Sequence, residues 1–155
     1  MKVAFGADHA GFELKEHLVE TARGLGYEVL DLGTNSADSV DYADYAVAVA
    51  EVVLDGSADL GVVLCSNGVG ISITANKVPG IRCALCHTSW GAARARQHTN
   101  ANMLALGAWE TGRAVADDIL QAFLTNEFEG GRHERRVAKL MKVERQGIGA
   151  ERSKA

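Results

Sequence analysis

The chain alternates short apolar runs with longer amphipathic segments, and this alternation limits the folds that it can adopt. Five runs have the length of strands, at residues 2–6, 27–32, 60–65, 82–86 and 103–107. The run LGVVLC at 60–65 is apolar on both faces, as is typical of a central strand in a parallel sheet. We therefore expect an α/β fold, a Rossmann-like three-layer α/β/α sandwich around a five-stranded parallel sheet.

The segments between and after these runs predict helices. Apolar residues recur at helical spacing over 11–25, 42–55, 90–98, 112–125 and 131–146, and a short helix ends near Lys77. In the first segment Leu14 and Leu18 are expected to face inward and Lys15 outward. A chain of 155 residues has the usual length of one domain. We assign residues 1–146 to a single domain and expect the tail at 147–155, which has nothing to bury, to be disordered.

Composition excludes several classes of protein. The net charge is −4, whereas a domain that binds nucleic acid is usually basic. No apolar run approaches the roughly 18 residues of a membrane span, and Asp8 interrupts the apolar start of the chain. Three cysteines cannot all pair with one another, which favours a reducing cytoplasm. We expect a cytoplasmic protein with neither nucleic acid nor membrane as a partner.

Cys83 and Cys86 have the spacing of a redox or zinc pair. They lie on a predicted strand, where positions three apart point to opposite faces and their Cα atoms are about 10 Å apart. That separation is too large for a disulfide, and no second pair completes a zinc site. We expect both to remain thiols and predict no metal site.

Polar groups follow several of the predicted strands at the carboxyl edge, where open α/β sheets bind ligands. Asp8 and His9 follow the first strand, and Cys65 ends the third. Ser66–Gly70 holds two glycines ahead of a helix, so it is either an anion cradle or a structural turn. Cys65 is accordingly either a thiolate base or nucleophile, or a small buried side chain.

The last predicted helix is basic. Residues 131–146 carry a net charge of +4, which leaves −8 on the rest of the chain. Arg132 and Arg136 are four residues apart and share a helix face, an arrangement that suits a phosphate clamp. The alternative is an ordinary solvated helix face.

Several separated motifs carry a family resemblance. They are GADHAGFELK at 6–15, DYADYA at 41–46, LCSNGVGISITANKVPGIR at 64–82, RQHTNAN at 96–102 and EGGRHERR at 129–136. In this order they resemble the type B ribose-5-phosphate isomerases, a family that also contains the galactose-6-phosphate isomerase subunits. The resemblance covers about residues 1–146. It implies an isomerase of carbohydrate metabolism that interconverts ribose 5-phosphate and ribulose 5-phosphate through an enediolate, without metal or organic cofactor.

The resemblance also implies a role for each matching residue. Cys65 would be the base that moves a proton between C1 and C2, and His98 would open the furanose ring. The substrate contacts would be Asp8, His9, Tyr42 and Thr99, with the enediolate oxygens held by the backbone of Ser66, Asn67, Gly68, Val69 and Gly70. The phosphate would be bound by Arg132 and Arg136 together with His9.

Three places depart from the family pattern. Ser66-Asn67 stands where members with a cysteine base usually continue Gly-Thr or Gly-Ser, Thr99 stands where Asn is common, and Trp109 replaces a frequent Arg. These changes leave open a four- or six-carbon aldose phosphate as substrate, such as galactose 6-phosphate or allose 6-phosphate. A non-catalytic domain that binds a phosphate ligand or a flavin on the same fold is the alternative from a different class.

The predicted order of elements separates Cys65 from His98. His98 precedes the fifth strand, so it should lie at the opposite edge of the sheet from Cys65. One chain cannot easily bring the two together, whereas a partner chain can. We therefore predict a homodimer, or a tetramer built from it, with active sites shared between chains.

Overall fold

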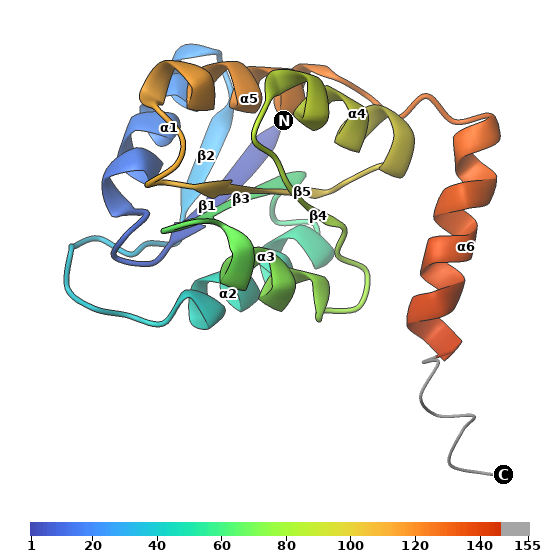
Figure 1. Cartoon of the computed structure of the whole chain (residues 1–155), viewed down its shortest axis with the longest axis horizontal. Coiled ribbons are helices and arrows are strands. Elements are labelled where there is room, and N and C mark those ends of the chain that lie inside the picture. Colours follow the sequence, from blue (N-terminus) through green and yellow to red (C-terminus); the bar gives the residue numbers. More distant parts are fainter. Residues whose placement is uncertain (147–155) are drawn as a thin grey trace, which may run out of the picture.

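The structure, a computed structural model, describes residues 1–146 of the chain. Strands and helices alternate until two helices end the fold (Figure 1). In chain order they are β1 Lys2–Ala7, α1 Phe12–Gly24, β2 Glu28–Asp31, α2 Tyr42–Leu54, β3 Leu60–Cys65, α3 Val69–Asn76, β4 Cys83–Leu85, α4 Ser89–Thr99, β5 Met103–Gly107, α5 Arg113–Thr125 and α6 Arg132–Gln146. The predicted α/β class is confirmed, and the predicted disordered tail at 147–155 lies outside the described residues.

The five strands form one parallel sheet in the order β2-β1-β3-β5-β4. All six residues of β3 are buried, as a run that is apolar on both faces predicts. Ala7 pairs with Leu64, and Cys65 pairs with Gly107. The carboxyl ends of β1, β3 and β5 therefore meet at one edge of the sheet.

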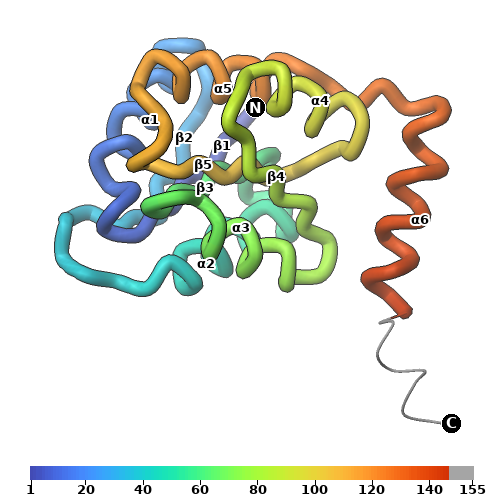
Figure 2. The backbone as a smooth tube through the Cα atoms, in the orientation of Figure 1, coloured from blue at the N-terminus to red at the C-terminus, as the bar shows by residue number. Residues whose placement is uncertain are grey.

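The helices cover the two faces of the sheet according to the direction in which each connection runs. The connections through α1 and α4 run one way across the sheet, and those through α2 and α3 run the other way. Because such crossovers are right-handed, α1 and α4 share one face and α2 and α3 the opposite face. Figures 1 and 2 show these two layers, with α5 beside α1 and α4.

The two faces have separate hydrophobic cores. Phe5, Leu64 and Phe123 belong to the core under α1, α4 and α5, and Val49 and Val63 belong to the core under α2 and α3. The chain leaves β1 toward the first face and β3 toward the second, so a crevice opens between the carboxyl ends of these neighbours. Such a switch point is where open sheets bind ligands.

Lys15 differs from the expectation that it faces solvent. Its side chain is fully buried, and Nζ lies 2.6 and 2.7 Å from the two carboxylate oxygens of Asp31 and 2.6 Å from Glu16. Position 15 shares a helix face with the buried Val19 and Ala22, which apolar spacing alone does not reveal. Asp31, at the end of β2, supplies the opposite charge that a buried ammonium requires.

The last helix, α6, stands at the β4 end of the sheet, away from α1 and β2 (Figure 2). It contacts α4, and Glu144 accepts a hydrogen bond of 3.0 Å from the backbone N–H of Gly80. Within residues 1–146, no helix has both the length and the apolar character needed to cross a membrane.

Candidate active site

Asp8 lies at the crevice and shapes the turn that leaves β1. Its carboxylate is buried, and Oδ1 accepts hydrogen bonds from the backbone N–H groups of Ala10 at 3.0 Å and Gly11 at 3.1 Å. Its own N–H donates to the carbonyl of Leu64 on β3. These contacts use Oδ1 and leave Oδ2 as an acceptor for a ligand hydroxyl.

Cys65 ends β3 with its side chain buried beside the following loop. The backbone N–H of Gly68 donates to its Sγ at 3.2 Å. The N–H of Val69 donates to the side-chain Oδ1 of Asn67 at 3.1 Å. The predicted anion cradle is thus partly occupied from within the chain, since two of its donors already have acceptors. A ligand oxygen that takes the Val69 donor must displace the Asn67 amide.

The loop after Cys65 is packed too closely for side chains at two positions. Gly68 has a φ of 75°, and a Cβ there would lie 2.9 Å from the carbonyl carbon of Leu106. A Cβ at Gly107 would lie 2.8 Å from the backbone of Asn67. Glycine at both positions lets the loop lie against the end of β5 and holds its donors next to the thiol.

Tyr42 reaches the same region from the opposite layer. It is the first residue of α2, and its ring covers the start of α3, where a Cβ on Gly70 would lie 2.6 Å from the ring carbon Cζ. Tyr42 as a whole is 42% exposed, so part of it remains accessible at this edge. Asp8, Tyr42 and Cys65, with the Ser66–Gly70 loop, thus surround one edge of the sheet.

His9 borders a cleft of about 460 Å³ between the N-termini of α1 and α5. Its Nδ1 lies 3.2 Å from the N–H and 3.3 Å from the carbonyl oxygen of Val40, which fixes the ring against the loop before α2. Trp109, 77% exposed, and Arg113 line the same cleft. The N–H of Trp109 donates to the carbonyl of Ser66 at 2.9 Å, which ties this cleft to the cysteine loop.

The other predicted residues gather at the amino edge of the sheet. His98 and Thr99 end α4, and the carbonyl of Thr99 accepts a hydrogen bond of 3.2 Å from Nε of Arg82, just before β4. Cys65, by contrast, pairs with Gly107 at the far end of β5. The length of β5, about 13 Å, separates the two edges. The structure does not bring His98 to Cys65 within one chain.

His98 has two partners to which the sequence assigns no role. Its ring stacks on His133 with centroids 4.1 Å apart and planes 10° apart. Oε2 of Glu129 lies 3.6 Å from Nε2 of His133 and 3.9 Å from Nε2 of His98. Glu129 and His133 are four residues apart in the EGGRHERR motif. That spacing is the sequence feature from which their contact could have been predicted.

Arg132 and Arg136 start α6 and are exposed. Nε of Arg132 donates to Nε2 of His133 at 3.4 Å, so this arginine belongs to the His98 group. His9, the third predicted phosphate ligand, follows β1 and borders the cleft at the N-termini of α1 and α5, whereas α6 stands at the β4 end of the sheet (Figure 1). One chain therefore does not assemble the predicted phosphate site of Arg132, Arg136 and His9.

His98, Glu129 and His133 have the donor composition of a zinc site, and their ligand atoms lie within 4.8 Å of one another. Each ring nitrogen binds a metal in the plane of its ring. The two stacked, nearly parallel rings cannot both meet this requirement for one ion. Arg132 also occupies the lone pair of His133. The geometry favours a hydrogen-bonding group over a metal centre.

Cys83 and Cys86 are unpaired thiols on and beside β4, in agreement with their rejection as a disulfide. Burial raises the pKa of Cys83 to about 12 and that of Cys86 to about 11. Both therefore remain protonated near neutral pH and do not act as thiolates.

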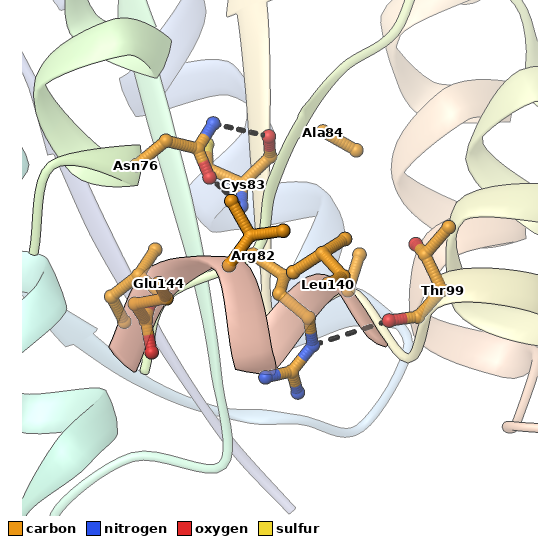
Figure 3. A pocket seen from close by; sticks show the side chains of 10 residues that line it. Asn76, Arg82, Cys83, Ala84, Thr99, Leu140 and Glu144 are labelled. Atoms are coloured by element: carbon orange, nitrogen blue, oxygen red, sulfur yellow. Dashed lines mark hydrogen bonds between the residues drawn. The ribbon is translucent and has the colours of Figure 1, made fainter. Parts of the chain in front are cut away.

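A groove of about 490 Å³ separates α6 from β4 and the segment before it (Figure 3). Its walls include Ile81 and Ala84 on one side and Leu140 and Val143 on the other. Leu140 and Val143 are about half exposed, at 44% and 53%. The groove leaves an apolar surface beside the edge strand, away from the Cys65 loop.

Comparison with known proteins identifies close relatives over nearly the whole chain. The family described as Ribose/Galactose Isomerase matches residues 3–140. Ribose-5-phosphate isomerase B of Escherichia coli is 44% identical over 143 residues, which cover 92% of this chain and 96% of that protein. D-erythrulose-4-phosphate isomerase of Pectobacterium atrosepticum is 38% identical over 147 residues, covering 94% and 97%. The solved structure of Clostridium thermocellum ribose-5-phosphate isomerase B is 47% identical, with a TM-score of 0.92 over 94% of this chain and 99% of that one.

Proposed function

This chain belongs to the ribose/galactose isomerase family and is a sugar-phosphate aldose–ketose isomerase, and we propose that it interconverts ribose 5-phosphate and ribulose 5-phosphate with Cys65 as the base. The observation that carries the proposal is the thiol at the carboxyl end of β3. It is buried directly after Leu64, whose carbonyl accepts a hydrogen bond from the N–H of Asp8, and a backbone N–H is directed onto its sulfur. A binding module needs an anion site but has no use for such a base.

The reaction needs a base, a donor set for the enediolate and an anchor for the phosphate. We assign the first step to the Cys65 thiolate, which takes the C2 proton while the C1 carbonyl oxygen receives the electron pair. Returning that proton to C1, with transfer of the O2 hydroxyl proton to O1, gives the ketose. Donors of the Ser66–Gly70 loop face the developing charge, and the free Oδ2 of Asp8 accepts a sugar hydroxyl. Tyr42 closes the side of the site nearest α3.

We propose that the working enzyme is a homodimer in which each site takes residues from both chains. Cys65, Asp8 and His9 come from one chain, and His98, Thr99, Arg132 and Arg136 come from its partner. The separation of these groups to opposite edges of one chain supports this division. The half-exposed apolar residues of α6 and the groove beside β4 provide surface for the second copy. No separate cofactor is needed, since proton transfer alone accounts for the reaction.

The identity of the sugar depends on the cleft beside His9. Trp109 forms an uncharged, bulky wall there, and Arg113 supplies the cation. One relative is named D-erythrulose-4-phosphate isomerase, after a four-carbon ketose phosphate, which supports a second chain length as an alternative. A four- or six-carbon aldose phosphate is therefore the second candidate substrate.

An isomerase assay across four-, five- and six-carbon aldose phosphates tests the assignment. We expect the highest kcat/KM with ribose 5-phosphate, and a clear preference for another chain length would replace that substrate. Binding of all the sugar phosphates without conversion of any would instead support the non-catalytic phosphate-binding alternative. We place the reaction in the cytoplasm, where the three thiols would stay reduced.

A further inference from the structure

The stacked pair of His98 and His133 is more constrained than a surface histidine pair. His133 is only 4% exposed, whereas the His98 side chain above it is 35% exposed. The backbone N–H of Glu129 donates to the carbonyl of Gln97 at 3.1 Å, and Arg94 lies 3.9 Å from the other carboxylate oxygen. The segment that carries Glu129 and His133 is thus attached to the end of α4.

His133 has the contacts of a neutral ring. Its Nε2 accepts from Nε of Arg132, so it must keep a lone pair there. Its Nδ1 is buried and has no hydrogen-bond partner among residues 1–146. Burial lowers the pKa of His133, and the neighbouring His98, Arg132 and Arg136 lower it further, against the opposite effect of Glu129. His98 therefore stacks on a ring that stays neutral.

The arrangement restricts His98 in two ways. The flat, buried face of His133 limits rotation of the His98 ring out of the stacking plane. The Glu129 carboxylate faces Nε2 of His98 at 3.9 Å, too far for a hydrogen bond but close enough to stabilise a positive charge there. A ring opener needs both a fixed direction and a stabilised proton.

We propose that His133 and Glu129 are positioning residues for His98, with His133 as its neutral platform and Glu129 as its counter-charge. This rests on the proposed function, in which His98 opens the furanose ring. Ring opening breaks the bond between C1 and the ring oxygen. The proton of the anomeric hydroxyl leaves, and a proton is delivered to the ring oxygen. His98 can perform this transfer only while its imidazole keeps its orientation toward the sugar.

The substrates themselves separate this role from general damage to the site. Ribose 5-phosphate is largely a closed ring, whereas ribulose 5-phosphate has its C5 oxygen esterified and cannot close one. Exchange of its C1 proton in D₂O needs the base but no ring opening. A positioning defect at His98 should therefore impair turnover of ribose 5-phosphate while leaving that exchange nearly intact.

The experiment compares His133→Ala, His133→Phe and Glu129→Gln in the full chain. We expect His133→Ala and Glu129→Gln to lower kcat for ribose 5-phosphate about tenfold or more while C1 exchange of ribulose 5-phosphate stays within about twofold. His133→Phe restores a flat neutral face and should recover most of the loss. The matched control is His17→Ala, which removes a partly buried histidine from α1 that also lies beside a carboxylate, Asp117 at 2.9 Å. It should change neither rate.

Equal losses of turnover and of exchange would overturn the proposal, as would unchanged turnover in Glu129→Gln. An equal rise of KM for both sugars would also overturn it, because His133 would then act through Arg132 and the phosphate. If His133→Ala does not fold, Glu129→Gln decides, since Glu129 is 46% exposed and tolerates an isosteric change. If Cys65→Ala keeps wild-type exchange, the proposed function fails instead, which is a distinguishable result.

Discussion

A site that is divided between two chains predicts complementation between two inactive variants. Cys65→Ala removes the proposed base and His98→Ala removes the proposed ring opener, so each homodimer should be inactive. In a mixed dimer, one site combines both lesions. The other combines the intact Cys65 of one chain with the intact His98 of its partner.

The magnitude follows from the symmetry of the dimer. Free exchange of equal amounts gives about half mixed dimers, each with one intact site of two, so about 25% of wild-type activity should return. The assay mixes the purified variants, confirms subunit exchange by mass spectrometry of an isotopically labelled chain, and then follows isomerisation. Each variant alone, at the same total concentration, is the control.

No recovery after demonstrated exchange would refute the shared site. It would require that one chain bring His98 to Cys65, against the observed placement of the two groups at opposite edges of the sheet. Recovery well above about 25% would contradict the two-site dimer, because random reassortment permits no more.

Three further predictions concern stability and thiol chemistry. Asp31→Ala removes the bidentate partner of the buried Lys15 ammonium and leaves it only the more exposed Glu16. It should lower the free energy of unfolding by up to about 3–5 kcal/mol in a denaturant titration, and an unchanged midpoint would contradict the buried pair. Gly68→Ala places a methyl group 2.9 Å from the backbone of β5 and should lower the free energy of unfolding by about 2–4 kcal/mol. The control Gly26→Ala has a φ of 88° but open space around it, so it should lose only about 1–2 kcal/mol. Equal losses in these two variants would show that the loop is not tightly packed. Burial raises the pKa of Cys83 to about 12, so only about one such thiol in a thousand is ionised near pH 9, against about half or more in the unfolded chain. Alkylation should therefore be at least about 500-fold slower than in the unfolded chain, and equal rates would count against burial.

The sheet could be predicted closely because its central strands are apolar on both faces. The predicted strands at 60–65 and 103–107 have the observed bounds. The predicted strand at 82–86 is shorter, Cys83–Leu85. The N–H of Arg82 bonds the side chain of Asn102 at 2.7 Å instead of continuing the ladder. A side-chain acceptor of this kind leaves no periodic signal in the sequence.

Charged contacts between distant elements were the harder part to predict. Helical spacing places Lys15 in solvent, because its partner, Asp31, lies 16 residues away on another element and leaves no local signal. His98 and His133 are 35 residues apart, and their stacking depends on how the segment before α6 attaches to α4. Motif order singles out candidate residues for the site, but only packing reveals which of them touch.

The most direct test of the proposed mechanism follows deuterium at C2 of ribose 5-phosphate incubated with the protein in D₂O. Cys83→Ala is the control, because it removes another buried thiol, on β4. The proposed mechanism predicts that the wild-type protein and Cys83→Ala incorporate deuterium and that Cys65→Ala does not. Incorporation by Cys65→Ala at the wild-type rate would contradict the assignment of Cys65 as the base.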